Sequence, residues 1–564
     1  MLKVDGLSVA FGPNVVLKDL SFSISVGESL GIVGESGSGK SITALSLMGL
    51  LPSTAKIISG ASSLQIGDSH PLNLFDIEPT DHRKVRGKHI AMIFQEPMTS
   101  LNPSMRCGRQ VAESIELHQK IKRKDAAQKC LSLFNEMQLP DPKKVYKNYP
   151  HELSGGQKQR VMIAMALAGN PSILIADEPT TALDVTIQKE ILILLKQIKH
   201  QRGMSLIFIS HDLGVISEIT ERLLVLKDGI LVEEGFTRDL LKNPKHPYTK
   251  GLIACRPPLD TRPQKLPTVQ DFVSIQEKTT IEPKVIDPQE WEKINQSIYS
   301  QEPIIRVENL DVDYTLKRSL WGKPTEKFQA VNSITFDLYP NETLGLVGES
   351  GCGKTTLGRA ILNLVNYSKG SITYKGQRVG AMTKKEMLAF RREVQIVFQD
   401  PFSSLNPRHT IGEAIMEPLM VHKLVSSSIK ATNKAMELLE QVSLSPDSFY
   451  RYPHEFSGGQ RQRVVIARAL ALSPKVIICD EMVSALDVSV QAQILNLMNR
   501  LKADRELTYI FISHDLSVVK YMSNRMLVMQ QGRLVEYGCP ENVYNRPQSD
   551  YTKKLIDSIP GLTS

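Results

Sequence analysis

Gly34-Glu-Ser-Gly-Ser-Gly-Lys-Ser41 and Gly348-Glu-Ser-Gly-Cys-Gly-Lys-Thr355 fit one pattern, Gly-x-x-x-x-Gly-Lys-Ser/Thr. Each stretch follows a short apolar run and precedes a helical one. The glycines let backbone N–H groups turn inward around phosphate oxygens, while the lysine reaches the β- and γ-phosphates and the hydroxyl ligates magnesium. We therefore predict two P-loops that bind a nucleoside triphosphate. The predicted residues are Gly34, Ser36, Gly37, Ser38, Gly39, Lys40, Ser41, Ile42, Gly348, Ser350, Gly351, Cys352, Gly353, Lys354, Thr355 and Thr356.

A second long motif indicates that the chain contains the same domain twice. Tyr149-Pro-His-Glu-Leu-Ser-Gly-Gly-Gln-Lys-Gln-Arg160 recurs as Tyr452-Pro-His-Glu-Phe-Ser-Gly-Gly-Gln-Arg-Gln-Arg463. Within each copy, short apolar runs rich in β-branched residues alternate with longer helical patterns, which is typical of an α/β domain with a largely parallel sheet. We predict a first domain over residues 1–255, a second over 304–564, and between them a linker over 256–303, which contains prolines and no sustained periodicity.

The composition excludes several classes of protein. Hydrophobic residues make up 41% and charged residues 23%, which is the balance of a globular protein. The net charge of +8 is spread along the chain, without the basic block that would indicate a nucleic-acid tail. The six cysteines lie far apart without zinc-like spacing, which favours a reduced, cytosolic protein. We expect no signal peptide and no membrane span, because no run of about 18 uninterrupted apolar residues occurs.

Adjacent carboxylates end a buried-strand pattern in each copy, at Asp177-Glu178 and Asp480-Glu481. Beside a P-loop, the aspartate is suited to hold magnesium and the glutamate to polarise the attacking water as general base, whereas a solvated turn is the alternative interpretation. His211 and His514 each follow another apolar run, inside the repeated sequence Ile-Ser-His-Asp-Leu. A lone histidine there is usually structural, but the recurrence favours a γ-phosphate contact. The predicted catalytic residues are Glu178, His211, Glu481 and His514.

Leu153-Ser-Gly-Gly-Gln157 and Phe456-Ser-Gly-Gly-Gln460 resemble the signature motif of the ABC ATPases, which P-loop ATPases of other families lack. The resemblance covers almost all of residues 1–255 and 304–545. It implies an α/β fold with two P-loop ABC ATPase domains. Each would have a RecA-like, mostly parallel sheet, an antiparallel β part and a helical subdomain.

The resemblance also implies roles for individual residues. In that family the signature of one cassette completes the ATP site of the other. Asp184 and Asp487 match the D-loop aspartate. The further ATP-binding residues that the family pattern implies are Gln95, Ser154, Gly155, Gly156, Gln157, Gln399, Ser457, Gly458, Gly459 and Gln460. The implied metal-binding residues are Ser41, Gln95, Asp177, Thr355, Gln399 and Asp480.

Three further stretches are similar to the dipeptide, oligopeptide and nickel importer group, namely Gln95 to Pro103, Gln399 to Pro407 and His246 to Leu252. Fused members of that group serve peptide, microcin C and glutathione import, which implies that the cargo is a peptide or peptide-like compound, with nickel as the alternative. The resemblance implies an ATPase using ATP and Mg²⁺, bound to two membrane permease subunits and served by an extracytoplasmic substrate-binding protein. It would lie on the cytoplasmic face of the bacterial inner membrane and bind no nucleic acid. The group's cysteine-rich C-terminal extension is missing, so no iron–sulfur or zinc site is carried over.

A different function remains open at this point, because soluble twin-cassette proteins also act on ribosomes or DNA. Their long charged helical linkers, zinc modules and coiled-coil insertions have no counterpart in this sequence, which favours the transport hypothesis. The sequence also departs from the family at one position: Pro179 follows Glu178, whereas Met482 follows Glu481. Methionine adds an N–H and frees the backbone after the second glutamate. We still expect two hydrolytic sites.

Overall fold

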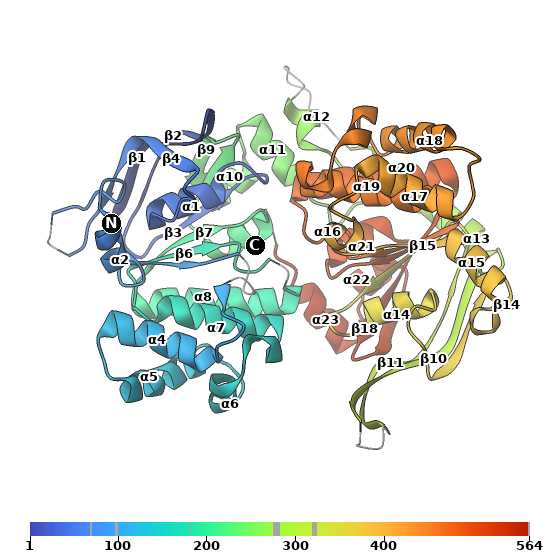
Figure 1. Ribbon diagram of the computed structural model, residues 1–564, viewed down its shortest axis with the longest axis horizontal. Helices are drawn as coiled ribbons and strands as arrows, with labels where there is room; N and C mark the ends of the chain where they lie inside the picture. Colours follow the sequence, from blue (N-terminus) through green and yellow to red (C-terminus); the bar gives the residue numbers. More distant parts are fainter. Residues whose placement is uncertain (68–69, 96–99, 182, 274–282, 319–323, 562–564) are drawn as a thin grey trace.

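The chain forms two α/β halves that lie side by side, the first drawn blue to green and the second yellow to red in Figure 1. The computed structural model describes residues 1–67, 70–95, 100–181, 183–273, 283–318 and 324–561. Part of the motif that follows Gln95, residues 96–99, lies outside the described residues. The two halves share most of their order of elements, as the duplicated motifs predict, and the second half has one additional short antiparallel strand.

A six-stranded sheet forms the centre of each half, with five parallel strands and one antiparallel edge strand. Its inner strands are buried along their whole length, because helices cover one face and the antiparallel sheet with one helix covers the other, and this explains why they read as continuous apolar runs. In the first half the order is β5 (Ile90–Ile93), β6 (Ile173–Asp177), β7 (Ser205–Ile209), β3 (Ser29–Val33), β8 (Arg222–Lys227) and β9 (Ile230–Phe236). In the second half it is β15 (Val394–Val397), β16 (Val476–Asp480), β17 (Thr508–Ile512), β12 (Thr343–Val347), β18 (Arg525–Gln530) and β19 (Arg533–Gly538).

A smaller antiparallel sheet packs beside each central sheet. In the first half it consists of β2 (Asn14–Ile24), β1 (Leu2–Phe11) and β4 (Ala55–Leu64). In the second half it consists of β11 (Pro324–Leu338), β10 (Ile305–Arg318), β13 (Lys369–Tyr374) and β14 (Gln377–Arg378). One apolar core fills the space between the two sheets of each half, and a third core extends from one half into the other.

Helices occupy the positions that the helical patterns predict. In each half a helical subdomain lies, along the chain, between two neighbouring strands of the central sheet, β5 and β6 in the first half and β15 and β16 in the second. In the first half it consists of α4 (Cys107–Gln119), α5 (Arg123–Glu136), α6 (Pro142–Lys147) and α7 (Gly155–Leu167). In the second half it consists of α16 (Pro401–Ser404), α17 (Ile411–Val421), α18 (Ser428–Gln441) and α19 (Gly458–Leu470). The other helices are α1 (Lys40–Met48), α2 (Pro79–Val85), α8 (Val185–Arg202), α9 (Leu213–Ile219), α10 (Thr237–Lys242), α11 (Pro247–Ala254), α14 (Lys354–Ile361), α15 (Lys384–Glu393), α20 (Val488–Arg505), α21 (Leu516–Met522), α22 (Pro540–Asn545) and α23 (Asp550–Asp557). The expected fold class, with its antiparallel part and helical subdomain, is confirmed.

The described parts of the segment between the halves contain helices that its sequence does not indicate. The segment contains α12 (Val269–Val273) and α13 (Pro288–Tyr299), although we expected no sustained periodicity in residues 256–303. Proline interrupts a helix in its interior, but at the first position of a helix, where Pro288 stands, it is favourable. The Asp287 side chain caps α13 by accepting a hydrogen bond from Gln289 N. Arg262 stacks on the ring of Trp291, 4.1 Å from its centroid, and so ties α13 to the rest of the segment.

Candidate active sites

Each P-loop joins the central strand of its sheet to a helix, so its backbone N–H groups converge at a helix N-terminus. Gly39 and Gly353 precede these helices with φ of 100° and 107°, values that favour glycine. Lys40 Nζ donates to the carbonyl oxygens of Gly34 and Glu35 over 2.8 and 2.9 Å, and Lys354 makes the same two contacts in the second loop. Both lysines are buried within their own loops. The two predicted P-loops therefore have the same geometry.

The P-loop hydroxyl and the strand-end aspartate meet in both halves. Ser41 Oγ donates to Asp177 Oδ1 over 3.2 Å, and Thr355 Oγ1 donates to Asp480 Oδ1 over 2.9 Å. Burial raises the pKa of the Asp177 carboxyl to about 6, although the hydrogen bond from Ser41 opposes the shift. Hydroxyl and carboxylate oxygens are the donors that Mg²⁺ prefers, and so few protein donors suit an ion that keeps phosphate and water ligands. These pairs fit the predicted metal site.

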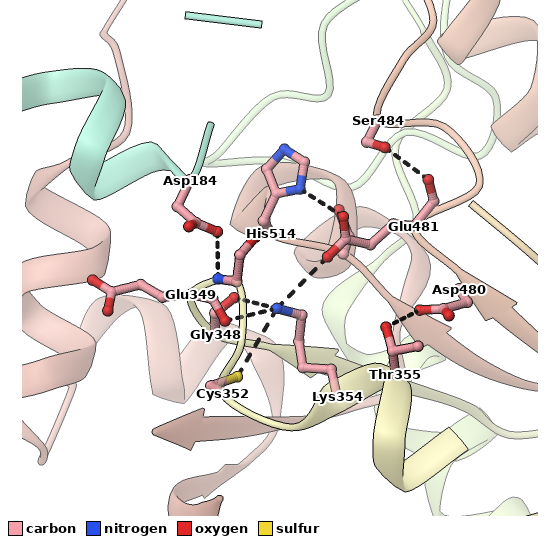
Figure 2. Close-up of polar contacts among 12 residues, drawn as sticks. Asp184, Gly348, Glu349, Cys352, Lys354, Thr355, Asp480, Glu481, Ser484 and His514 are labelled. Carbon is pink, nitrogen blue, oxygen red and sulfur yellow. Dashed lines mark hydrogen bonds and ion pairs between the residues drawn. The ribbon is translucent and has the colours of Figure 1, made fainter. Parts of the chain in front are cut away.

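The glutamate after each strand is held by the predicted glutamine and histidine, as Figure 2 shows for His514 and Glu481. Gln399 Nε2 lies 3.1 Å from Glu481 Oε2, and His514 Nδ1 lies 3.4 Å from the same atom. In the first half Gln95 Nε2 and His211 Nδ1 lie 3.0 and 3.2 Å from Glu178 Oε2. The structure therefore brings these three side chains together in each half.

Opposite charges outweigh burial in setting the pKa values of Glu178 and His211, the predicted catalytic residues of the first half. Burial disfavours the ionised Glu178 carboxylate, but the hydrogen bond and charge of His211, helped by Thr181 and Lys40, outweigh it and hold the pKa at about 2. Burial also lowers the pKa of His211, yet Glu178 and the nearby Asp487 raise it overall. The pKa of Glu481 is lowered in the same way by His514. At neutral pH each glutamate is thus an ionised carboxylate, as a general base requires.

The backbone conformation shows whether Met482, which stands where the first half has Pro179, changes the position of the preceding glutamate. Glu178 and Glu481 both have a φ of 47°, a conformation that non-glycine residues adopt only when the surroundings impose it. The N–H of each glutamate donates over 3.0 Å to a carbonyl of the neighbouring strand, at Ile209 and Ile512. These bonds, together with the buried side chain of Met482, hold the second glutamate as the first is held. Methionine in place of proline therefore leaves the backbone conformation of the glutamate unchanged.

The two sites differ in one hydrogen bond that the sequence analysis did not predict. Thr181 Oγ1 donates to Glu178 Oε2 over 2.9 Å, whereas the corresponding Ser484 Oγ donates to the Glu481 backbone carbonyl over 2.8 Å. In the second site Lys354 Nζ lies 3.6 Å from Glu481 Oε1 instead. The sequence contains one signal for this contact, because a hydroxyl residue stands three positions after each glutamate.

Replacing Thr181 by Val should lower ATP turnover about fivefold, because Glu178 loses a hydrogen bond to its charged form while the side-chain shape is kept. Thr181→Ser should restore the hydroxyl and the rate. Ser484→Ala is the matched change in the second half and should alter turnover less than about twofold, since that hydroxyl does not contact the carboxylate. Steady-state ATPase rates of the three variants check this, and equal losses from Thr181→Val and Ser484→Ala would contradict it.

The two halves meet at their P-loops. Asp184 of the first half accepts a hydrogen bond from Ser350 N over 2.5 Å, and Asp487 of the second half accepts one from Ser36 N over 2.8 Å. Figure 2 shows Asp184 beside the second P-loop, next to Glu349. A cavity of about 110 Å³ lies between the halves, and His211 and His514 both line it. Each D-loop aspartate thus reaches the P-loop of the opposite half.

The signature residues occupy the N-termini of α7 and α19. Ser154 accepts a hydrogen bond from Gln157 N and forms a capping box with it, and Ser457 and Gln460 do the same. Their predicted contact with the opposite nucleotide remains a prediction. Cys352, which stands where the first loop has Ser38, is buried like that serine, and burial raises the pKa of its thiol.

Two P-loops, two carboxylate pairs and a D-loop contact in each direction define a twin-cassette ATPase. The sequence model described as "ABC transporter" matches residues 17–181 and 331–484. The model described as "Oligopeptide/dipeptide transporter, C-terminal region" matches residues 232–280 and 535–564. The chain belongs to the ABC transporter family, as one of its ATP-binding subunits.

The chain is similar over nearly its whole length to several import proteins. It is 46% identical to the glutathione import ATP-binding protein GsiA of Shigella boydii serotype 4 and to that of Escherichia coli strain K12, over 99% of this chain and 89% of each relative. It is 47% identical to that of Pectobacterium atrosepticum, over 96% of this chain and 86% of the relative. Among solved structures, the dimeric post-hydrolysis form of the ATP-binding cassette MJ0796 is 29% identical, with a TM-score of 0.38, over 42% of this chain and 99% of that one.

The family matches and the relatives confirm the general function that the sequence predicts. The protein is an ATP-binding and ATP-hydrolysing motor subunit of an ABC transporter, and such a subunit works at a membrane together with permease components. The alternative of a ribosome- or DNA-acting protein finds no support in the relatives. No helix in the described part of the chain is both long and apolar enough to cross a bilayer.

Proposed function

We propose that this chain powers the import of glutathione or a similarly small peptide. The observation that carries the proposal is the 46% identity to glutathione import ATP-binding proteins over 99% of the chain. The match of both tail segments, residues 232–280 and 535–564, to the oligopeptide/dipeptide transporter region supports the same class of cargo. Glutathione is itself a tripeptide, so the two indications agree chemically.

We infer that ATP binds at both P-loops and that magnesium accompanies it. Ser41 with Asp177, and Thr355 with Asp480, would hold the ion, with Gln95 and Gln399 close by; the ion would neutralise phosphate charge. Glu178 and Glu481 would accept a proton from the attacking water, while His211 and His514 keep these carboxylates ionised and oriented. The signature segments beginning at Ser154 and Ser457 would close the site of the opposite cassette. The domains would be residues 1–255 and 304–564, joined by 256–303.

The transporter would contain two integral-membrane permease subunits and receive cargo from an extracytoplasmic substrate-binding protein. The chain would then lie on the cytoplasmic face of the bacterial inner membrane, with its two cassettes pairing inside one polypeptide. Hydrogen bonds between the halves at Asp184 and Asp487 support that pairing. ATP binding would draw the cassettes together and hydrolysis would release them, and the motion would drive the permeases.

Reconstitution tests this proposal. The full chain, co-purified with its permease subunits, is placed in liposomes with ATP inside and the external binding protein outside. Radiolabelled glutathione should accumulate, and the accumulation should require Mg²⁺ and ATP. Labelled di- and tripeptides and nickel serve as competing cargoes. Uptake of nickel without uptake of glutathione or peptides would refute the proposed cargo class.

Apolar side chains on the helical subdomains should couple hydrolysis to transport. Phe402, Val421 and Ile429 are 56%, 67% and 74% exposed on α16, on α17 and at the start of α18. Phe402→Ala should lower cargo-stimulated ATPase and uptake about tenfold, because exposed aromatic anchors contribute strongly to interfaces, and basal ATPase should change less than about twofold. A proportional loss of basal hydrolysis would contradict the coupling role. Ile193→Ala, an exposed change on α8 away from this surface, is the control.

A further inference from the structure

Two tyrosines in the tail segments contact the P-loops directly. Tyr248 lies in α11, and its hydroxyl oxygen accepts a hydrogen bond from Glu35 N over 3.0 Å. Tyr551 lies in α23 and accepts one from Glu349 N over 2.9 Å. Both phenol rings are buried, and burial raises both pKa values, so the hydroxyls stay protonated. The same contact thus occurs twice, on residues more than 200 positions from the loops they touch.

Each tyrosine completes a set of hydrogen bonds at the entry of its P-loop. The N–H of Glu35 goes to Tyr248 of the same half, and the next N–H, that of Ser36, goes to Asp487 of the opposite half. In the second loop the corresponding acceptors are Tyr551 and Asp184. Two successive N–H groups are therefore held, one by the cassette's own tail and one by the other cassette. The position of the first residues of the P-loop therefore depends on both the tail and the opposite cassette.

The tails also reach across to the opposite half. Helix α11 packs against α20, and α23 packs against α8, as Figure 1 shows for the red helix beside the first half. Lys189 Nζ donates to the carbonyl of Asp557 over 2.5 Å, and Ser217 Oγ donates to that of Gly561 over 2.7 Å. Since α8 and α20 begin directly after Asp184 and Asp487, the helix that carries each D-loop contact also seats the opposite tail.

We propose that Tyr248 and Tyr551 are positioning residues through which the tail segments link the geometry of each P-loop to the docking of the opposite cassette. A tail seated on the opposite D-loop helix holds its tyrosine against its own P-loop. When the cassettes separate, the tail loses that seat and the loop entry loses one of its two anchors. This gives α11 and α23, the helices of the tail segments that carry the tyrosines, a role in the cooperation between the sites. The inference rests on the proposed assignment of the P-loops as ATP sites.

The test uses the full chain with Tyr248→Phe and Tyr551→Phe, which remove the acceptor and keep the buried ring. Tyr537→Phe is the matched control, because this tail residue is 72% exposed. Each test variant should raise the KM for ATP about three- to tenfold, the effect of one lost hydrogen bond, and should lower the Hill coefficient toward one. Tyr537→Phe should match the wild type in both. Circular dichroism and the melting temperature establish that the variants fold.

A second readout separates positioning from general destabilisation. If Tyr248 and Asp487 act on one loop, the losses in ATP affinity from Tyr248→Phe and Asp487→Ala should be less than additive, whereas Tyr551→Phe with Asp487→Ala should be additive. Folded Phe variants with unchanged KM and Hill coefficient would overturn the inference, and so would additivity in both pairs. The proposed ATP sites fail separately, if Lys40→Ala and Lys354→Ala leave ATP binding intact.

Discussion

Replacing either Glu178 or Glu481 by Gln is expected to lower ATP turnover about 100-fold or more, the contribution of a general base. Glutamine has the same shape and can still accept the contacts from Gln95 or Gln399, but it cannot take a proton from water. The loss should be severe for each single variant, because alternating or concerted hydrolysis by two linked cassettes fails when one base is missing. Nucleotide binding should be kept, since no P-loop group changes.

The measurement combines steady-state ATPase rates with equilibrium titration of ATP. Glu440→Gln, an exposed change on α18, is the control and should behave like the wild type. If Glu481→Gln hydrolysed ATP at nearly the wild-type rate while Glu178→Gln was inactive, the second centre would be non-hydrolytic. The equal φ of 47° at both glutamates argues against that outcome, because the backbone that carries the base is the same with Pro179 or Met482 behind it.

The central architecture could be predicted from the sequence because its signals are local. A short apolar run such as 173–176, bounded by turn residues and followed by a helical period, predicts a buried parallel strand without any tertiary information. The P-loop pattern is also a local signal, because its glycines stand at positions with positive φ, a conformation that favours glycine. Duplication then strengthened each local signal by repeating it.

The parts that were missed depend on contacts between distant segments. Nothing near Tyr248 in the sequence indicates that its hydroxyl would meet Glu35, and only resemblance drew attention to the tail. Thr181 was overlooked because a hydroxyl after a strand is usually a turn residue. The helix α13 was missed for a local reason, because Asp287-Pro288 starts a helix as well as it breaks one.

The hydrogen bonds from each P-loop to the D-loop aspartate of the opposite half support a composite ATP site, in which the second cassette completes the first P-loop. Lys40→Ala should lower turnover about 100-fold, because the lysine would stabilise charge on the transferred phosphate, and should reduce bound ATP from two molecules to one. Ser457→Arg should damage the same site by placing a bulky cation at the N-terminus of α19. If the site is shared, the double variant should be little worse than Lys40→Ala alone.

Ser457→Arg also removes the N-cap of α19, at a cost of about 1 kcal/mol to its helix, so loss of activity alone would not locate the defect. The duplicated chain supplies the control. Ser154→Arg removes the equivalent cap of α7 but would act on the site of Lys354, so adding it to Lys40→Ala should damage both sites and abolish ATP binding. If each cassette instead closed its own site, the pattern would reverse: Lys40→Ala with Ser154→Arg would be non-additive, and Lys40→Ala with Ser457→Arg would lose both nucleotides. Because Asp487 of the second half already bonds to Ser36 in the first P-loop, we expect the crossed pattern.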